Sequence, residues 1–435
     1  SINTDTNSLS DNLVYTEGVD DENYLATGDI TLNMLQLSAA AEDEYADLTE
    51  YGTKYNSYWY GNSFVIQLPN GHFIINDGGA KEEFVELATY LKGIVGTTED
   101  GVQKPVYIDA WTVSHQHADH FDIVKAVVDD PTVAEGIYVD AFYISEPNAK
   151  TLALGSLDGD VDKQYYGMTL FTKGENDEQT DIYRMQTGQR YYFNGIIMDV
   201  IQAQEQIPYS EYAKVSAMKD DLDFNTASAV LLFTTSNNQK VLIGGDANYV
   251  NMGYIMEAYD SNVTDEGYTP TSLLQNINAL VAFHHGKNMS MEIGSASSIL
   301  FADPDYSFID YLTNGGHVFD YVLYPCSLVY DDASDPVYAF PNAGETNAYL
   351  NKKVKNNNLI KNIISSSNII FSAYNNGIAV SIPYSGNGYW TVPSNGYLHI
   401  IVAGSYINSY RLFTSSGVVI WYCGDDINGN TKWNT

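Results

Sequence analysis

The sequence is poor in cysteine and in positive charge. Its 435 residues include two cysteines, Cys326 and Cys423, which lie far apart and outside any metal-ligand spacing. Free thiols are therefore the default expectation, and a disulfide between them stays open. Lys and Arg number 20 against 55 Asp and Glu, a formal net charge of −35. Such a surface repels polyanions, so we expect no general nucleic-acid-binding surface.

Long hydrophobic runs are missing too. No segment approaches the length of a transmembrane helix, and no signal peptide is present, although a mature chain would already have lost one. The few cysteines and basic residues, together with many Asn, Ser, Thr and Tyr residues, favour an exported bacterial protein, extracellular or at the cell surface. The oligomeric state does not follow from the sequence.

Histidine is scarce, with eight in the chain, yet three fall within six residues. They belong to the stretch S-H-Q-H-A-D-H at 114–120, between an apolar run at 106–113 that predicts a buried strand and a periodic segment at 121–128 that predicts a helix. Neutral imidazoles and a carboxylate suit Zn²⁺, Mn²⁺ or Fe. The spacing lets alternate histidines reach one metal while the Asp-His pair turns toward a second. Such clustering disfavours the competing interpretation, a solvated polar loop. The candidate ligands are His115, His117, Asp119 and His120.

Three further motifs are apolar runs that end in polar residues. Residues 70–79 close on Asp77-Gly-Gly, residues 241–246 on Gly-Gly-Asp246, and residues 280–286 on His-His-Gly. Together with the histidine-rich loop, and in this order, they resemble the motifs of the metallo-β-lactamase superfamily. The resemblance covers residues 28–385. It implies an α/β chain folded as an αββα four-layer sandwich, with a metal site at one edge of the two sheets.

The resemblance also implies a site for two divalent metals, Zn²⁺ in the first place, with Mn²⁺ or Fe as alternatives. Asp246 would bridge the metals, and His285 would close the second site. His284 would face the substrate, stabilising developing charge or protonating the leaving oxygen, but the roles of His284 and His285 could be reversed. Asp77 would orient a ligand histidine. By the same resemblance, His115 and His117 hold the first metal, Asp119 and His120 hold the second, and Asp119 also orients the nucleophile.

One departure from the superfamily pattern concerns the first metal. Most members carry a third histidine for it, between the histidine-rich loop and the bridging Asp, whereas no histidine lies between His120 and Asp246 here. The nearest replacement is Glu205, just after a predicted strand at 196–203. Glu205 could bind the metal, hold a water of the metal, or be an ordinary surface acid.

The missing histidine limits the resemblance to one branch of the superfamily. With Asn225-x-x-Ser228 before the strand to Gly-Gly-Asp, and with His-His-Gly, the chain is similar to the branch that contains the hydrolase domain of bacterial competence (DNA-uptake) proteins and the teichoic-acid phosphorylcholine esterase. This implies a two-metal phosphodiesterase acting on a small-molecule or cell-surface phosphodiester outside the cell. The alternatives are a nuclease of the competence type and a degenerate, non-catalytic binding or adhesion protein.

Two segments flank the predicted hydrolase domain, and one insertion lies within it. Residues 1–27 form an acidic N-terminal leader, and residues 386–435 a small β-rich C-terminal module. The insertion at 38–60 brings aromatic residues that either line the substrate cleft or pack the insertion onto the sheet. These residues are Tyr55, Tyr58, Trp59 and Tyr60.

Overall fold

The computed structural model describes the stretches that carry the histidine-rich loop and the Gly-Gly-Asp motif. Several expectations fall outside the described residues: the leader except residue 26, the insertion at 38–60, Glu205, Cys326 and the side chain of His285. The described residues are 26, 30–34, 63–145, 161–203, 225–236, 238–261, 269–286, 308–317, 319, 321–324, 369–371, 380–384, 388–392, 397–403, 406–413, 419–426 and 431–434.

The first sheet brings the ends of parallel strands to one edge. In it, β3, β4, β6 and β7 run parallel in that order, β5 also pairs with β4, and β1 and β2 precede β3 in antiparallel pairing. β2 and β3 form a hairpin, with Gly71 at φ 86° in its turn. Because parallel strands finish at the same edge, Asp77 at the end of β3 lies beside Ser114, which follows β4. The strands are β1 (Ile30–Met34), β2 (Ser63–Gln67), β3 (Phe73–Asp77), β4 (Val106–Val113), β5 (Ile137–Val139), β6 (Ala141–Ile144) and β7 (Asp181–Arg184).

The second sheet presents the other two motifs. Its order is β14-β13-β12-β11-β10-β9-β8, with antiparallel pairing from β8 to β11 and parallel pairing from β11 to β14. The parallel neighbours β11 and β12 lead directly into Asp246 and His284 at one edge. The strands are β8 (Arg190–Phe193), β9 (Ile196–Gln202), β10 (Val230–Thr235), β11 (Lys240–Ile243), β12 (Ala279–Val281), β13 (Tyr321–Tyr324) and β14 (Ile369–Phe371).

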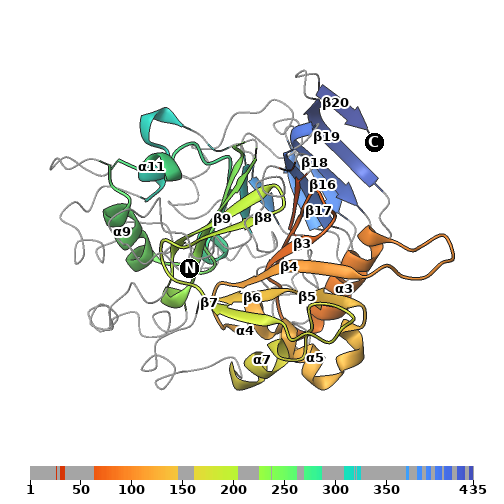
Figure 1. The fold of residues 1–435 in the computed structure, drawn as a ribbon. Helices are drawn as coiled ribbons and strands as arrows, with labels where there is room; N and C mark the ends of the chain where they lie inside the picture. Colours follow the sequence, from red (N-terminus) through yellow and green to blue (C-terminus); the bar gives the residue numbers. More distant parts are fainter. Residues whose placement is uncertain are drawn as a thin grey trace, which may run out of the picture.

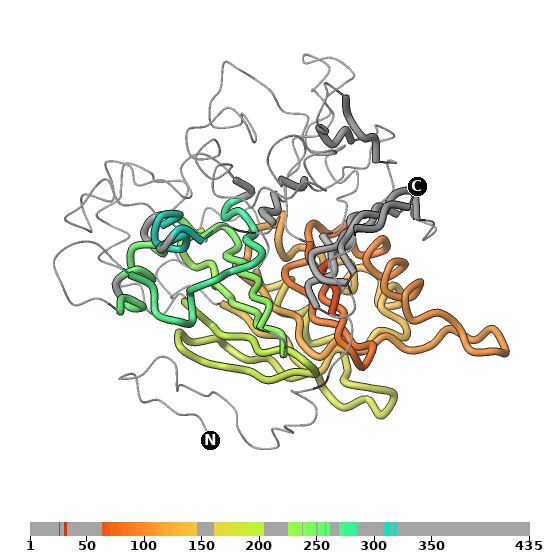
Figure 2. Tube along the Cα trace, turned by 90° about the horizontal axis from the view of Figure 1, so that it is seen from above, coloured from red at the N-terminus to blue at the C-terminus, as the bar shows by residue number. Residues whose placement is uncertain are grey.

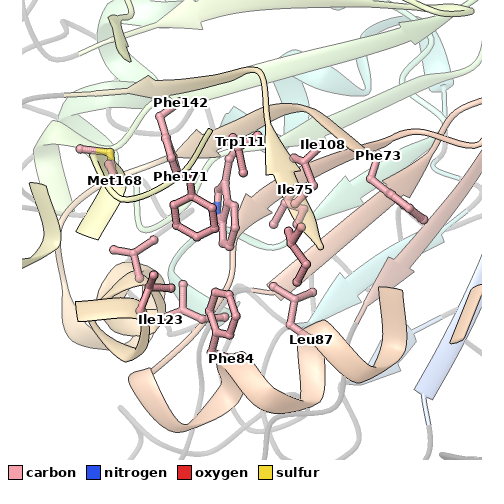
Figure 3. Packing of buried hydrophobic residues seen from close by; sticks show 14 of the residues in the cluster. Phe73, Ile75, Phe84, Leu87, Ile108, Trp111, Ile123, Phe142, Met168 and Phe171 are labelled. Carbon is pink, nitrogen blue, oxygen red and sulfur yellow. The ribbon is translucent and has the colours of Figure 1, made fainter. Parts of the chain in front are cut away.

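Helices cover the outer face of each sheet. One buried cluster joins the first sheet to α3, α5 and α7, and Figure 3 shows Phe84 and Leu87 of α3 beneath Trp111 and Ile75 of the strands. A second cluster joins the other sheet to α9 and α11 (Figure 1). The predicted αββα layering is thus confirmed. The helix predicted at 121–128 is broken into α4, a 3₁₀ turn and α5. The helices are α3 (Phe84–Val95), α4 (Ala118–Phe121), α5 (Lys125–Asp129), α7 (Val161–Met168), α9 (Tyr249–Ala258) and α11 (Phe308–Leu312), with 3₁₀ turns at Lys81–Glu83, Asp122–Val124, Pro131–Ala134, Asn225–Ala227, Ser272–Leu274, Phe283–Gly286 and Asn314–Gly316.

The inner faces of the two sheets meet directly. The ring of Tyr143 on β6 packs edge-on against Tyr191 on β8, with centroids 4.6 Å apart. Near the ends of the strands, the Ala229 N–H donates to the Ser114 carbonyl at 2.9 Å. Seen from above, residues 63–145 in orange and residues 225–286 in green form two adjacent halves (Figure 2). The histidine-rich loop therefore lies at the junction of the halves.

The C-terminal strands continue the first sheet. β17 pairs antiparallel with β1, with Leu32 opposite Ile400, and β18, β19 and β20 follow outward. The treatment of residues 386–435 as a separate module stays a prediction. Among the described residues, no helix is long and apolar enough to cross a membrane. These strands are β15 (Val380–Tyr384) and β16 (Gly388–Val392), which pair with each other, and β17 (Tyr397–Ala403), β18 (Tyr406–Phe413), β19 (Val419–Asp426) and β20 (Thr431–Asn434).

Candidate metal centre

The histidine-rich loop folds back on itself between β4 and α4. His117 is extended, with φ −61° and ψ 151°, and the helix starts at the next residue. Its carbonyl accepts the N–H groups of His120 and Phe121, which turns His120 back toward the strand end. The rings of His115 and His120 consequently lie 4.1 Å apart, and both are fully buried. Local backbone geometry is thus sufficient to gather these imidazoles.

The first group of candidate ligands consists of His115, His117 and Asp246. His115 Nε2 lies 3.0 Å from His117 Nδ1 and 3.7 Å from Asp246 Oδ2. One donor atom from each residue lies within 4.8 Å of the others. Two imidazole nitrogens and a carboxylate oxygen form a donor set that suits Zn²⁺.

The second group consists of Asp119, His120 and Asp246. His120 Nε2 lies 3.0 Å from Asp246 Oδ1 and 3.5 Å from Asp119 Oδ2, and these donors also fall within 4.8 Å of one another. Asp246 therefore belongs to both groups and turns a different oxygen toward each. This arrangement fits a pair of divalent cations that share one carboxylate.

Asp77 lies behind the second group, fully buried. Its Oδ1 accepts the Ser114 N–H and its Oδ2 accepts the Ser114 hydroxyl, both at 2.7 Å. His120 Nδ1 lies 2.8 Å from the same Oδ2. The Asp77 backbone has φ 58°, and its carbonyl accepts the indole N–H of Trp111 at 2.6 Å. Asp77 is therefore positioned to hold His120 with Nε2 directed at Asp246.

Ser228 was quoted in the sequence pattern but given no role there. Its Oγ accepts the Asp246 N–H at 3.0 Å and lies 3.2 Å from His115 Nδ1. It is fully buried just before β10. The Ser228 hydroxyl thus contacts two residues of the first group, His115 after β4 of the first sheet and Asp246 after β11 of the second sheet. The position of Ser228 three residues after Asn225 was the available signal.

The Gly-Gly of Gly-Gly-Asp permits the two halves to approach. A Cβ on Gly245, which has φ 51°, would lie 2.5 Å from the Ser114 Cβ. A Cβ on Gly244 would lie 2.3 Å from the ring of Phe283. Side chains at these positions would push the Asp246 turn away from the histidine-rich loop.

His284 reaches the same centre from the turn after β12. It has φ 49°, its N–H donates to the Gly245 carbonyl at 2.9 Å, and its Nε2 lies 3.6 Å from Asp246 Oδ2. Its side chain is 12% exposed, more than those of His115 and His120, which are fully buried. Because the side chain of His285 and all of Glu205 lie outside the described residues, the division of roles among these three stays a prediction.

Burial and charge drive the two central histidines in opposite directions. Burial lowers the pKa of His115 well below its ordinary value, and the neighbouring His120 lowers it further. Burial also opposes protonation of His120, but the charges of Asp246 and Asp119, together with hydrogen bonds to Asp246 and Asp77, outweigh it and hold its pKa well above the ordinary value. The second group is thus the more strongly negative environment.

A buried amide network fixes the loop from below. The Gln116 side chain donates to the Ser145 carbonyl at 2.9 Å, and the Gln164 amide on α7 donates to the Gln116 carbonyl at 2.9 Å and to Asp122 Oδ1 at 2.8 Å. The Ser145 hydroxyl in turn donates to the Ala227 carbonyl at 2.5 Å. No local pattern in the sequence marks this network, because the Gln164 side chain contacts a loop 48 residues away.

The sequence matches no family model and no curated protein. Among solved structures, the chain is similar to YhfI of Bacillus subtilis, a metallo-β-lactamase fold protein, at 10% identity over 58% of this chain and 70% of that one, with a TM-score of 0.30. The chain is also similar to a possible metal-dependent hydrolase of Veillonella parvula, at 11% identity over 76% of this chain and 96% of that one, with a TM-score of 0.31. A third similar structure is a metallo-β-lactamase of Cronobacter sakazakii, at 15% identity over 43% of this chain and 59% of that one, with a TM-score of 0.24. At TM-scores this low the function has to be inferred from the residues of the chain itself.

Proposed function

We propose that this chain is a metal-dependent hydrolase that uses two divalent ions, Zn²⁺ in the first place, to cleave a phosphodiester. The observation that carries the proposal is the shared carboxylate of Asp246. Its Oδ2 lies 3.7 Å from His115 Nε2, and its Oδ1 lies 3.0 Å from His120 Nε2. A carboxylate that faces two ligand groups is the usual bridge in two-metal hydrolytic sites, in which the ions lie roughly 3.5–4 Å apart.

The chemistry divides between the ions and the side chains. When bound, divalent ions of this kind lower the pKa of a water ligand to ~7 and so supply a nucleophile at neutral pH. Asp119 can orient that nucleophile, because its carboxylate is 14% exposed and lies beside His120. His284 lies on the Oδ2 side of Asp246, where it can hold a substrate oxygen or give a proton to the leaving oxygen.

The phosphodiester preference is supported by the motif resemblance. The chain lacks the third histidine of the β-lactamase type and in this respect resembles the branch that acts on phosphodiesters. The net charge of −35 favours a small or surface-bound phosphodiester over a long nucleic acid. Composition favours action outside the bacterial cell. Within the described residues, the basic side chains of Lys81, Lys125 and Lys163 are paired with Asp122 or Asp129 on the helical layer.

The test is turnover of bis(4-nitrophenyl) phosphate by the full chain, with nitrocefin and duplex DNA as competing substrates. We expect hydrolysis of the small phosphodiester that a chelator abolishes and added Zn²⁺ restores. His120→Ala should lower turnover by roughly 10³-fold or more, because it removes a ligand and the orienting contact of Asp77.

The matched control is His72→Ala, which removes another carboxylate-paired histidine. His72 Nδ1 lies 2.7 Å from Asp109 Oδ1. His72 directly precedes the first residue of β3, whereas Asp77 is the last residue of that strand. This variant should keep the wild-type rate. Turnover that resists chelation, or an H120A rate equal to that of the wild type, would refute the metal mechanism; preferential cleavage of nitrocefin or DNA would refute the phosphodiester assignment.

A further inference from the structure

The two ligand groups differ in what lies behind their histidines. Behind His120, the Nδ1 atom meets the Asp77 carboxylate at 2.8 Å. Behind His115, the Nδ1 atom meets two hydroxyls, Ser114 Oγ at 3.0 Å and Ser228 Oγ at 3.2 Å. All of these partners are buried, so water does not screen the difference. One histidine is supported by an anion and the other by neutral groups.

Hydrogen bonding to Asp77 and to Ser114 favours the same tautomer for both histidines. The Asp77 carboxylate can only accept, so His120 keeps a proton on Nδ1 and would present its Nε2 lone pair to a cation that displaces the Nε2 proton. The Ser114 hydroxyl gives its one proton to Asp77 and can therefore only accept from His115 Nδ1. Both imidazoles are thus prepared to bind a cation through Nε2. Asp77 acts on His120 directly and on His115 only through Ser114.

The charge count favours the same group. Besides the shared Asp246, the second group contains the carboxylate of Asp119 and has Asp77 behind it. Among the residues that the structure describes, the first group adds imidazoles, from His115 and His117, and no further carboxylate to Asp246. Opposite charges attract far more strongly in a buried, weakly screened site than in water. A carboxylate behind a ligand histidine also raises its basicity as a donor.

We propose that the group of Asp119, His120 and Asp246 is the high-affinity metal site, and that it fills before the group of His115, His117 and Asp246. The inference rests on the proposed function, since it concerns the same two ions. It deepens that function by making the one-metal chain, with the ion beside Asp119, the form present when metal is scarce. Two-metal hydrolysis would then switch on with occupancy of the weaker first site.

The test is a Zn²⁺ titration of the metal-free full chain at constant pH, by calorimetry, with metal content counted by elemental mass spectrometry. We expect two resolved steps for the wild type. His117→Ala should remove the weak step and keep the tight one, whereas Asp119→Asn should weaken the tight step. Asp77→Asn should weaken the tight step by about 10–100-fold, the usual effect of losing a partner behind a ligand histidine.

The matched control is Asp109→Asn, which alters the remote His72 pair and should leave both steps unchanged. Circular dichroism checks that each variant is folded. For any variant that is not, ¹⁵N-histidine spectra of the wild type with one equivalent of Zn²⁺ decide the order. The ring nitrogens of His120 should shift first, with those of His115 and His117 unchanged.

The opposite order overturns the inference: a tight step lost in H117A, or shifts first at His115 and His117. Phosphodiester turnover measured in parallel separates the two proposals. A two-metal chain that fills in the opposite order and still cleaves the phosphodiester refutes only the order. A chain that fills in the expected order without cleaving any phosphodiester refutes only the phosphodiesterase assignment.

Discussion

The two halves of the centre deliver their side chains in different ways. The first half supplies His115, His117, Asp119 and His120 from one loop, gathered by the turn into α4. The second half supplies Asp246 and His284 from separate turns after β11 and β12. The first arrangement needs little more than correct local backbone geometry. The second depends on how closely one sheet approaches the other, so the second half is the more sensitive to small changes in packing.

The position of the histidine-rich loop can be disrupted by a substitution in the core beneath it. Trp111 is fully buried, packs on Phe142 with centroids 5.4 Å apart, and holds the Asp77 carbonyl through its indole N–H. Trp111→Ala should cost about 3–5 kcal/mol of unfolding free energy, measured by chemical denaturation. Because Asp77 loses its anchor, tight Zn²⁺ binding should weaken as well. A loss below about 1 kcal/mol would mean that this core is not needed to position the loop.

The approach of the halves can be tested at Gly245. Gly245→Ala places a Cβ 2.5 Å from the Ser114 Cβ at φ 51°, so it combines a clash with backbone strain. We expect a loss of about 2–4 kcal/mol in thermal or chemical unfolding, together with lower metal content.

The matched control for this effect is Gly71→Ala. Gly71 has φ 86° in the β2–β3 turn, and nothing lies within 4 Å of its added Cβ. This variant carries only the backbone strain, so it should cost about 1 kcal/mol and leave metal content unchanged. Equal losses at the two glycines would show that the halves are not in close contact at Gly245.

The smallest effect sharpens the contrast between a buried and an exposed His-Asp pair. The hydrogen bond that His72 donates to Asp109 raises the pKa of His72 above 6.5, against the lowering effect of partial burial. A pKa raised by folding contributes stability that is present below pH ~6.5 and is lost as the pH rises through the raised value.

The measurement is unfolding free energy against pH for the wild type and His72→Gln. Because the His72 side chain is 37% exposed, solvent screening should keep the difference at or below ~1 kcal/mol. The wild-type advantage should shrink as the pH increases from about 6 to 8. An advantage that grows over that range would show that Asp109 does not favour the protonated His72.

The motifs of the sequence implied the αββα architecture through their resemblance, and they located the local part of the centre. The apolar runs that end at Asp77, Ser114, Asp246 and His284 mark strand ends, and strand ends at one edge bring their following residues together. The spacing H-x-H-x-D-H separated the loop into two ligand groups, because side chains that alternate along an extended segment follow a different period once the chain enters a helix. Such information is local, so it can be read from neighbouring residues.

The surroundings of these side chains depend on the tertiary structure. The contacts of Ser228 with His115 and Asp246, and of Gln164 with Gln116, join residues that are far apart in the chain. The difference between a carboxylate behind His120 and hydroxyls behind His115 likewise arises where β3, β4 and the start of β10 meet. Hydrogen bonds between distant segments depend on the packing of the two sheets, and no local pattern of residues encodes that packing.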